Sequence, residues 1–313
     1  MKKDLQSLFD DFARQAENAE GRSVKTVANY RQNFELLKTF KPKIQVKDLT
    51  SATMSDFFFY LNTRPRKVGT KMIVRKLQGS SLATVRGKLS SFFVWLKDNG
   101  HLRENPFDKI AYPDVSYTKR EAFTRDELDK LYLAVSRDIL WDNPFQKKRN
   151  LTMVMFLTLT GVRKEELLGL LLSDLDMKNR ILTIRPEISK SKRYRTIPVS
   201  KELADYLAEY LEARKSYTTP CLWVSSTSDS GFTEHGAKHL KKQLDKATGL
   251  NCHLHRFRHT FAVNYYMATK DLLHLSRLMG HRDASVTLKI YLRWLPDEKL
   301  LSELDAMRVA LFR

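Results

Sequence analysis

Residues 180–199, RILTIRPEISKSKRYRTIPV, decide the fold class of this chain. Residues 180–185 and 194–199 are short β-like runs, and the basic, polar stretch 186–193 separates them. This arrangement is typical of a β-hairpin with a lysine-rich turn. The rest of the chain shows helical patterns, so the sequence predicts a mainly α fold with a small β-sheet in its second domain.

Helical patterns lie on both sides of this hairpin. Residues 153–159 form an apolar run that Thr160-Gly161 ends, and helical patterns return from Ala204 to the C-terminus. Residues 124–135, TRDELDKLYLAV, begin with a threonine N-cap and carry acidic residues in the first turn, as a new helix does.

The first hundred residues also favour helices. Residues 23–38 begin with a serine cap and space Val27, Tyr30, Phe34 and Leu37 three and four apart, which predicts one amphipathic helix. Residues 52–61 and 82–96 predict two more, the second ended by Asn99-Gly100. No strand pattern appears, so we expect an all-α module.

The helical period lapses between residues 105 and 124, where two prolines and polar residues are typical of an interdomain linker. We therefore expect a helical domain over residues 1–115, a linker over 116–123, and a second domain with mixed helices and strands over 124–313.

The chain carries a large positive charge. It has 55 Lys and Arg against 36 Asp and Glu, a formal net charge of +19 and a pI near 9.8. Such a charge indicates a polyanionic partner, with nucleic acid as the first candidate. A membrane surface is the alternative, but no run of about 18 apolar residues and no apolar core of a signal peptide is present. We expect a soluble, cytoplasmic protein.

One part of the helical domain has only positive charges. No acidic residue lies between Asp56 and Asp98. A solvated surface would explain such a run, but its length favours a phosphate-binding face. The candidate DNA-binding residues are Arg64, Arg66, Lys67, Lys71, Arg75, Lys76, Arg86 and Lys88.

Metal and disulfide chemistry are not indicated. Cys221 and Cys252 form no CxxC pair, which argues against a disulfide framework or a cysteine zinc site. His253, His255 and His259 lack a nearby carboxylate partner, so we expect no metal site.

Several short stretches of the second domain carry cationic or hydroxyl groups. Arg163 lies in TGVRKEEL, where it could simply pair with Glu166 three residues later. In HLHRFRHTFA, His255 and Arg258 share one helical face and could hold one anion together. His281 and Tyr291 lie in LMGHRDASVTLKIY, where a structural role would explain each of them alone.

The combination is more specific than its parts. The motifs TGVRKEEL, KSKRYRTIPV, HRFRH and LMGHRDASVTLKIY, in this order, resemble the catalytic domain of tyrosine recombinases, the phage-integrase and Xer-like family. SSLATVRGKLSSFFVWLKDNGHLRENP, residues 80–106, is similar to the family's helical, SAM-like core-binding domain. The resemblance covers nearly the whole chain.

The resemblance assigns a role to each candidate. It implies that Arg163 is the first catalytic arginine, accompanied by acidic Glu166 and Asp174. The remaining catalytic positions match His255 and Arg258 of the HxxR pair, His281, the nucleophile Tyr291, and the hairpin lysine Lys190, with Lys192 close enough to be confused with it. The ten-residue step from His281 to Tyr291 is one longer than in the tightest form of the motif.

The implied activity is DNA strand breakage and rejoining by transesterification. Arginine side chains can present forked donors to the non-bridging oxygens of a phosphorane. His255 would accept the proton of Tyr291, and Lys190 would protonate the leaving 5′-oxygen as general acid. The product would be a 3′-phosphotyrosyl link, which needs no cofactor.

Two alternatives remain at this stage. A type IB topoisomerase uses similar side chains, but the apolar stripe of residues 300–311 favours a tail that docks on a neighbouring protomer. A catalytically silent DNA-binding regulator would not need a nucleophile. The expected partners are double-stranded DNA with inverted-repeat core sites and further copies of the chain, as a tetramer on two DNA sites. The target sequence and the biological role, in integration, excision, inversion or dimer resolution, do not follow from these residues.

Overall fold

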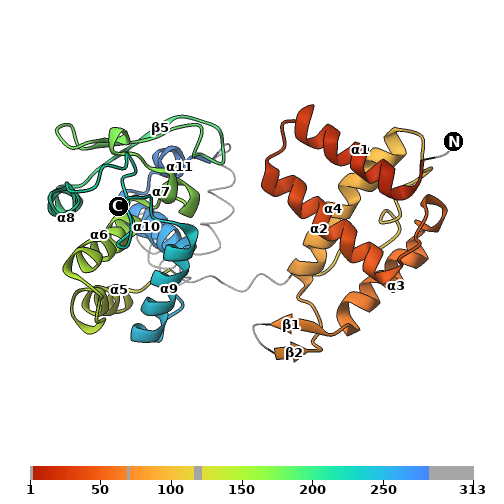
Figure 1. Ribbon diagram of the computed structural model, residues 1–313, viewed down its shortest axis with the longest axis horizontal. Coiled ribbons are helices and arrows are strands. Elements are labelled where there is room, and N and C mark those ends of the chain that lie inside the picture. The colour runs from red at the N-terminus through yellow and green to blue at the C-terminus, as the bar shows by residue number, and fades with distance from the viewer. Residues whose placement is uncertain (1–2, 69–70, 116–121, 282–313) are drawn as a thin grey trace, which may run out of the picture. The chain divides into compact units, whose positions relative to one another are not determined.

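The structure is a computed structural model that describes residues 3–68, 71–115 and 122–281. The chain forms two compact units, an N-terminal unit of residues 1–118 and a C-terminal unit of residues 119–313 (Figure 1).

Helices dominate the N-terminal unit. They are α1 (Leu5–Asn18), α2 (Val24–Phe40), the single 3-10 turn η1 (Val46–Asp48), α3 (Ser51–Thr63) and α4 (Gly79–Asp98). The side chains of Asp4, Ser23 and Thr50 accept hydrogen bonds from backbone amides of the first turns of α1, α2 and α3. The helices expected over 23–38, 52–61 and 82–96 are confirmed as α2, α3 and α4.

Aromatic side chains fill the core of this unit. The rings of Phe9 and Phe34 stack with their centroids 4.0 Å apart, and Phe92 meets Phe9 edge-on at 5.1 Å. Phe93 and Phe107 lie 5.4 Å apart, and all five rings are buried. The packing holds α1, α2 and α4 together, because each of these helices contributes at least one of the rings.

The expectation of an all-α first module was wrong in one place. Strands β1 (Arg66–Val68) and β2 (Lys71–Ile73) pair antiparallel between α3 and α4, at one end of the unit (Figure 1). Each strand has only three residues, which is too short for the alternation of apolar and polar residues that reveals longer strands.

The C-terminal unit combines helices with one sheet, as the fold class predicted. Its helical segments are α5 (Arg125–Leu133), which continues as a π-helical turn η2 (Ala134–Asp138), α6 (Pro144–Thr160), α7 (Lys164–Gly169), the 3-10 turn η3 (Leu172–Asp174), α8 (Lys201–Ala213), α9 (Glu234–Thr248), α10 (Leu254–Thr269) and α11 (Leu272–Met279). Thr124 caps α5 and forms a capping box with Glu127, as its sequence indicated.

The predicted hairpin is present as β4 (Ile181–Ile184) and β5 (Arg195–Pro198), and β3 (Leu175–Asp176) adds a third strand that the sequence did not suggest. The register pairs Ile184 with Arg195, so the lysine-rich stretch forms the connection at this end.

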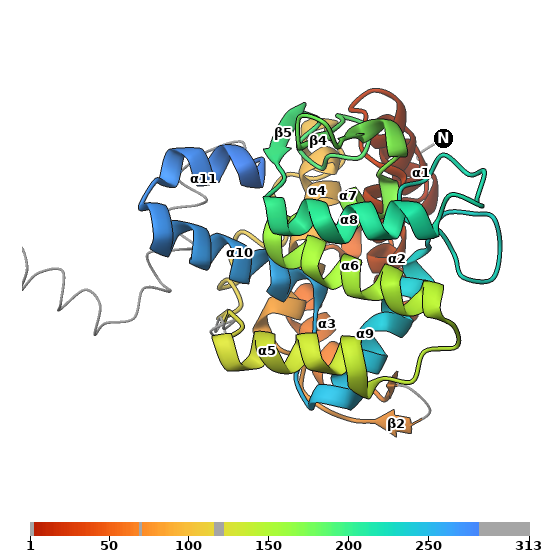
Figure 2. The ribbon, with the colours of Figure 1, turned by 90° about the vertical axis from the view of Figure 1, so that its left-hand side faces the viewer.

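Helix α6 forms the centre of this unit. It packs against α8 and α10 (Figure 2). The side chains of Met153, Phe156 and Leu157 on α6 are buried in the core. Across the described parts of both units, none of the helices is long and apolar enough to cross a membrane.

Candidate active site

A glycine turn after α6 positions Arg163. Gly161 has a φ of +60°, in the left-handed region that favours glycine, and a Cβ there would lie 2.4 Å from Cδ1 of Phe261. The turn ends α6 and places Arg163 directly before the first residue of α7. Only glycine allows both the backbone conformation and this close approach.

Glu166 holds Arg163 in two ways. One carboxylate oxygen, Oε2, accepts the backbone N–H of Arg163 at 2.9 Å, and the other, Oε1, accepts its Nη1 at 2.9 Å. The Glu166 side chain is completely buried, whereas that of Arg163 is 17% exposed. The pairing that a structural explanation of Arg163 predicted is therefore present.

A second arginine binds the same carboxylate. Arg195 on β5 donates from Nη1 to Oε1 of Glu166 at 2.9 Å and from Nη2 to Oε2 at 2.7 Å. Burial by itself would raise the pKa of Glu166, but the hydrogen bonds and charge of Arg195, and then those of Arg163, lower it to about 2. Glu166 is thus ionised throughout the neutral range.

Arg195 was missed in the sequence. It lies within YRTIPV, a pattern that predicted only a strand of the hairpin. A signal was available, because alternation along the strand puts Arg195 on the same face as the buried Ile197 and Val199.

Arg258 lies on α10 and is almost fully buried. Its Nη1 donates to the carbonyl oxygen of Gly161 at 2.8 Å, and its Nη2 donates to that of Met279 at 2.5 Å. His255 lies one turn earlier on the same helix and is exposed. The two residues of the HxxR pair are therefore both on the first turns of α10.

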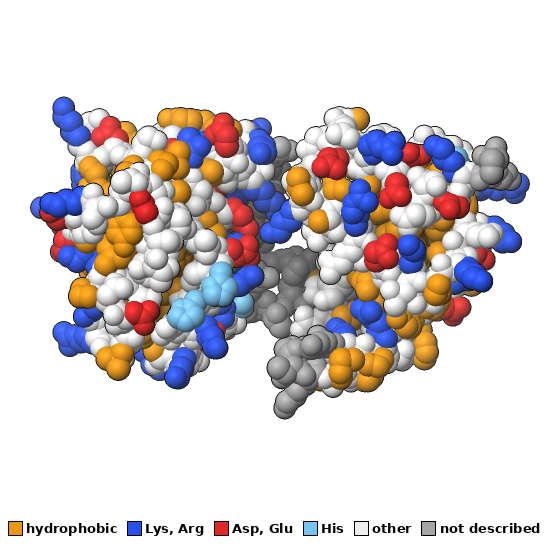
Figure 3. All heavy atoms as spheres, viewed as in Figure 1, with side chains coloured by type: hydrophobic (Ala, Val, Ile, Leu, Met, Phe, Trp, Pro, Cys, Tyr) orange, Lys and Arg blue, Asp and Glu red, His pale blue; other side chains and the backbone are white. Residues whose placement is uncertain are grey.

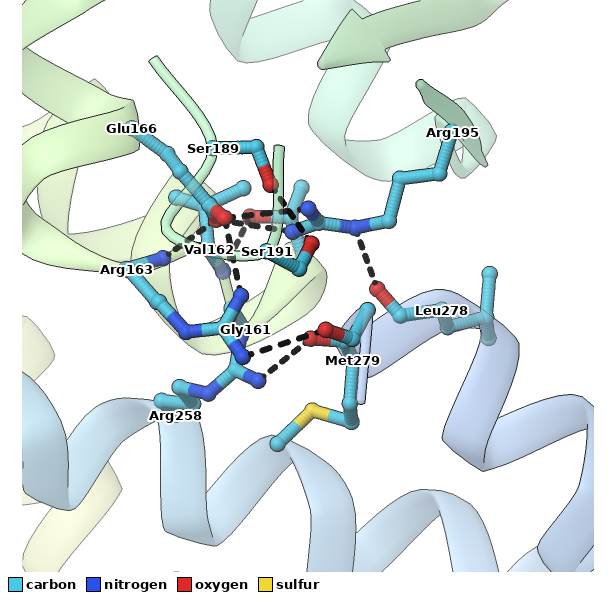
Figure 4. A network of polar contacts seen from close by, with 12 residues as sticks. Gly161, Val162, Arg163, Glu166, Ser189, Ser191, Arg195, Arg258, Leu278 and Met279 are labelled. Carbon is cyan, nitrogen blue, oxygen red and sulfur yellow. Dashed lines mark hydrogen bonds and ion pairs between the residues drawn. The ribbon is translucent and has the colours of Figure 1, made fainter. Parts of the chain in front are cut away.

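The C-terminal end of α11 is where the arginines meet. The carbonyl oxygens of three consecutive residues, Leu278, Met279 and Gly280, accept hydrogen bonds from Arg195, Arg258 and Arg163, respectively, at 2.9, 2.5 and 3.4 Å. The last carbonyls of a helix have no partner within the helix and carry its partial negative charge. Figure 4 shows these side chains converging on α11 from three other segments.

His281 follows this helix end. Gly280, with a φ of +62°, ends α11, and Nε2 of His281 lies 3.3 Å from Nη2 of Arg258. Burial, and then the charges of Arg258, Arg163 and Arg195, lower the pKa of His281 to about 4. The imidazole is therefore neutral near pH 7, and its Nε2 accepts from Arg258, because a guanidinium only donates.

The lysine-rich connection between β4 and β5 is anchored near its tip. The hydroxyls of Ser189 and Ser191 are buried and lie 2.9 Å apart, while Lys190 between them is exposed. Lys192 is also exposed and has a φ of +55°. The choice of Lys190 over Lys192 as the hairpin lysine stays a prediction.

Asp174 has a separate partner. Its Oδ1 accepts Nε of Arg185 at 2.7 Å, and its Oδ2 accepts the backbone N–H of Leu171 at 2.8 Å. Arg185 also donates to the carbonyl oxygen of Gly169. This ion pair, in which Asp174 is buried and Arg185 is half-buried, joins η3 to the end of β4 and lies apart from the bonds of Arg163 and Arg258.

The structure thus brings Arg163, Arg258 and His281 together. Tyr291 and the apolar stripe of the tail lie outside the described residues. Among the residues that are described, no three His, Cys, Asp or Glu side chains lie where they could hold a metal ion together.

The candidate DNA-binding residues differ in what they contact. Arg75 and Lys76 are exposed, and Arg66 donates to the carbonyl oxygen of Arg75 at 2.6 Å. Arg64 lies over the ring of Tyr60, and Lys88 lies over that of Tyr30. The side chains of Lys67 and Lys71 are outside the described residues. On the face drawn in Figure 3, the end of the N-terminal unit near the hairpin of β1 and β2 shows basic and apolar side chains and no acidic ones.

Arg86 has an internal role that its sequence did not indicate. Its guanidinium donates to the carbonyl oxygens of Phe107, Ile110 and Ala111 at 2.7 to 2.8 Å. These bonds tie the segment after α4 back onto that helix. Phosphate binding by Arg86 stays a prediction.

Family models match both halves of the chain. The model described as the phage integrase family matches residues 121–297, and the one described as the phage integrase N-terminal SAM-like domain matches residues 9–100. Together they account for most of the sequence.

Relatives and solved structures agree with these matches. Tyrosine recombinase XerC of Thermodesulfovibrio yellowstonii is 27% identical over 75% of this chain and 81% of its own, and that of Roseiflexus castenholzii is 26% identical over 90% and 88%. The Tn1549 transposon integrase bound to transposon right end DNA has a TM-score of 0.74 at 17% identity, covering 96% of this chain and 99% of that one. A lambda integrase dimer bound to a core site has a TM-score of 0.69 at 19% identity, covering 92% and 77%. At these identities the structures show a shared fold.

Proposed function

This chain belongs to the phage integrase family of tyrosine recombinases, and on that premise we propose that it is a site-specific recombinase that cleaves and rejoins DNA through a 3′-phosphotyrosyl link to Tyr291. The observation that carries the proposal is the meeting of Arg163, Arg258 and His281 at the C-terminal end of α11. Two arginines and a histidine from separate segments meet there, and His281 lies ten residues before Tyr291.

The proposed chemistry requires stabilisation of a phosphorane. Arg163 and Arg258 are permanently charged and would donate to the non-bridging oxygens as negative charge develops there. Their bonds to Glu166 and to backbone carbonyls support this role, since they fix both guanidinium groups before DNA binds. Neutral His281 would add a further donor once its ring turns toward the phosphate.

Proton transfer would involve two exposed side chains. The phenol of Tyr291 must lose a proton on attack, and His255 would accept it. The leaving 5′-oxygen must gain one, and Lys190 would supply it from the hairpin turn. The 3′-phosphotyrosyl bond keeps the energy of the phosphodiester, so an incoming 5′-hydroxyl can reverse the step. No metal or nucleotide enters this scheme.

The proposed partners follow from charge and from the relatives. The solved relatives named above are bound to DNA, and we infer that this chain binds duplex DNA with inverted-repeat core sites and acts in the cytoplasm. The basic residues of the N-terminal unit would contact phosphates, with Arg75 and Lys76 as the most accessible of those described.

Assembly would involve the tail. The apolar stripe of residues 300–311 would dock on a neighbouring protomer and give a tetramer on two DNA sites. Deleting the residues after Asp297 is expected to leave single-site binding intact and to abolish pairing of two sites. If the truncated protein recombines two sites at the normal rate, the tail instead covers its own domain.

The decisive test traps the covalent intermediate. A nicked suicide duplex, built on the sequence that the wild-type protein selects from a random DNA pool, should give a protein–DNA adduct, and peptide mapping should place it on Tyr291. Tyr291→Phe removes one oxygen and keeps the ring, so folding and DNA binding should survive while the adduct is lost.

The same assay separates the alternatives. An adduct on another residue, or efficient cleavage by Tyr291→Phe, would contradict the mechanism. A silent regulator would bind the duplex and give no adduct with the wild-type protein. A topoisomerase would relax supercoiled DNA without exchanging strands between two sites.

A further inference from the structure

Glu166 binds two arginines, Arg163 through its backbone N–H and Nη1 and Arg195 through Nη1 and Nη2. Each of its oxygens accepts one bond from Arg163 and one from Arg195. The carboxylate has one negative charge, and the two guanidinium groups have one positive charge each. The cluster therefore keeps a net positive charge at a site where Glu166 is completely buried.

We propose that Arg195 is a positioning residue for the recombination reaction: it neutralises Glu166, so that the charge of Arg163 remains available for the scissile phosphate, and it ties β5 to the helix end before His281. The inference rests on the proposed function. Arg195 itself would not touch the DNA.

The electrostatic part follows from burial. In a medium of low dielectric constant, an isolated Glu166–Arg163 pair would attract strongly and would leave no net charge for an incoming anion. A second guanidinium on the same carboxylate restores that charge. A lysine would do so less well, because the planar fork of arginine matches the two oxygens of a carboxylate with two parallel bonds.

The geometric part follows from the third bond of Arg195. Its Nε donates to the carbonyl oxygen of Leu278 at 2.9 Å, three residues before His281. A Cβ on Gly280 would lie 2.9 Å from Nη1 of Arg195, so the guanidinium packs directly on the helix end. Only 8% of the Arg195 side chain is exposed. Strand β5, which follows the turn that carries Lys190, is thereby fixed to the segment that carries His281 (Figure 4).

A neighbouring pair offers a matched control. Arg185, at the end of β4, also bonds a buried carboxylate, that of Asp174, and a backbone carbonyl, that of Gly169. Unlike Arg195, Arg185 does not share its carboxylate with Arg163. Arg185→Met therefore removes a similar set of bonds without changing the charge balance at Arg163.

The experiment compares Arg195→Met with Arg185→Met on two versions of the suicide duplex. One carries the normal scissile phosphate, and the other carries an uncharged methylphosphonate at the same position. On the normal duplex, Arg195→Met should slow cleavage about 100-fold at saturating DNA, in the range for loss of one transition-state donor, and Arg185→Met less than about threefold. On the neutral duplex, the loss for Arg195→Met should shrink to less than about tenfold, because less charge needs stabilisation.

Neutral Glu166 gives a second and independent comparison. Removing both charges of the pair is better tolerated than removing one, so the double variant Arg195→Met/Glu166→Gln remains informative even if Arg195→Met does not fold. Relative to Glu166→Gln alone, the double variant should cleave within about tenfold, because no buried carboxylate is left to neutralise Arg163 and only the bond to Leu278 is lost.

The outcomes separate this inference from the proposed function. No adduct with the wild-type protein would overturn both. Wild-type cleavage together with an equally active Arg195→Met variant would overturn the inference alone. So would an equal loss on the charged and neutral duplexes, or a loss of about 100-fold on adding Arg195→Met to Glu166→Gln.

Discussion

The two units of this chain use charge in opposite ways. In the N-terminal unit the described ion pairs lie at the surface, with each partner at least 23% exposed, and stacked phenylalanines fill the core. The C-terminal unit buries Glu166, Asp174 and Arg258 among its apolar residues. Each buried ion costs on the order of several kcal/mol of desolvation free energy. The comparison shows that the second unit accepts this cost, at Glu166 and Arg258 in the proposed site and also at Asp174 outside it, whereas no charged side chain described in the first unit is buried.

The largest expected effect is on cleavage. Arg258→Met removes the guanidinium that bonds Gly161 and Met279 and should lower the cleavage rate about 1000-fold, which corresponds to about 4 kcal/mol of transition-state stabilisation. Single-turnover cleavage of the suicide duplex measures it. Arg256→Met on the same helix removes an ion pair with Glu127 and should leave the rate nearly unchanged. Equal losses in both variants would mean that buried charge in this unit serves folding alone.

The second prediction concerns the aromatic core. Phe92 contacts Phe9, Phe12 and Phe34 and is fully buried, so Phe92→Ala should destabilise the N-terminal unit by about 4 kcal/mol. Hydrogen exchange of α2 and α4 amides in the full chain reports this loss. Phe59→Ala, at a side chain that is 71% exposed, should cost less than about 0.5 kcal/mol. Exchange that accelerates equally in α6 would show that the units do not unfold separately.

Acid should destabilise the C-terminal unit more than the N-terminal unit. The folded pKa of His281, about 4, lies below its ordinary value of 6.5, so the unfolded chain binds more protons and stability begins to fall below pH 6.5. Glu166, with a folded pKa of about 2 against 4.5, adds a further loss as the pH falls through this interval, up to about 3 kcal/mol in all for this group.

The N-terminal unit should respond less to the same change. Its carboxyls with lowered pKa, such as those of Asp4 and Asp48, are at least partly exposed, and solvent screens their interactions. Amide exchange followed from pH 7 to pH 3, corrected for intrinsic rates, should therefore rise first in α6 and α10. If exchange rises first in α2 and α4 instead, the acid-sensitive groups lie in the N-terminal unit and the prediction is wrong.

The smallest effect is expected at the surface of the N-terminal unit. Reversing the charges of the exposed Arg75 and Lys76 to Glu should weaken DNA binding and lower the slope of log affinity against log salt by about two. Titration of labelled duplex at several salt concentrations measures the slope. Lys43→Glu, on an exposed residue outside the acid-free stretch, should change it by less than about one. An unchanged slope in the double variant would remove these two residues from the interface.

Local signals were sufficient for much of the fold. The caps Ser23 and Thr124 lie next to the helices that they begin, and the two β-like runs around residues 186–193 pair with each other. Such features depend on residues a few positions apart. The hairpin of β1 and β2 was missed because its strands are too short to show alternation.

The site depends on contacts that local patterns do not contain. Arg195 and Glu166 are 29 residues apart, and the sequence around Arg195 does not indicate which carboxylate it binds. Arg258 was found through the family motif, but its bonds to Gly161 and Met279 could not be read from that motif. The spacing of His255 and Arg258 predicted that they share a helical face. Only the folded chain shows that the arginines meet at the C-terminal end of α11.

The helix end at α11 also has a consequence for synthesis on the ribosome. Arg163 reaches a carbonyl 117 residues later in the chain, and Arg195 one 83 residues later. Domains of a growing chain fold in order from the N-terminus, and contacts between distant residues form last. A nascent chain that stops before residue 278 lacks the three carbonyl acceptors that the arginines share at the end of α11. Under the proposed function, the unit that would bind DNA is therefore complete well before the unit that would cut it, and unfinished chains would lack the assembled cleavage site.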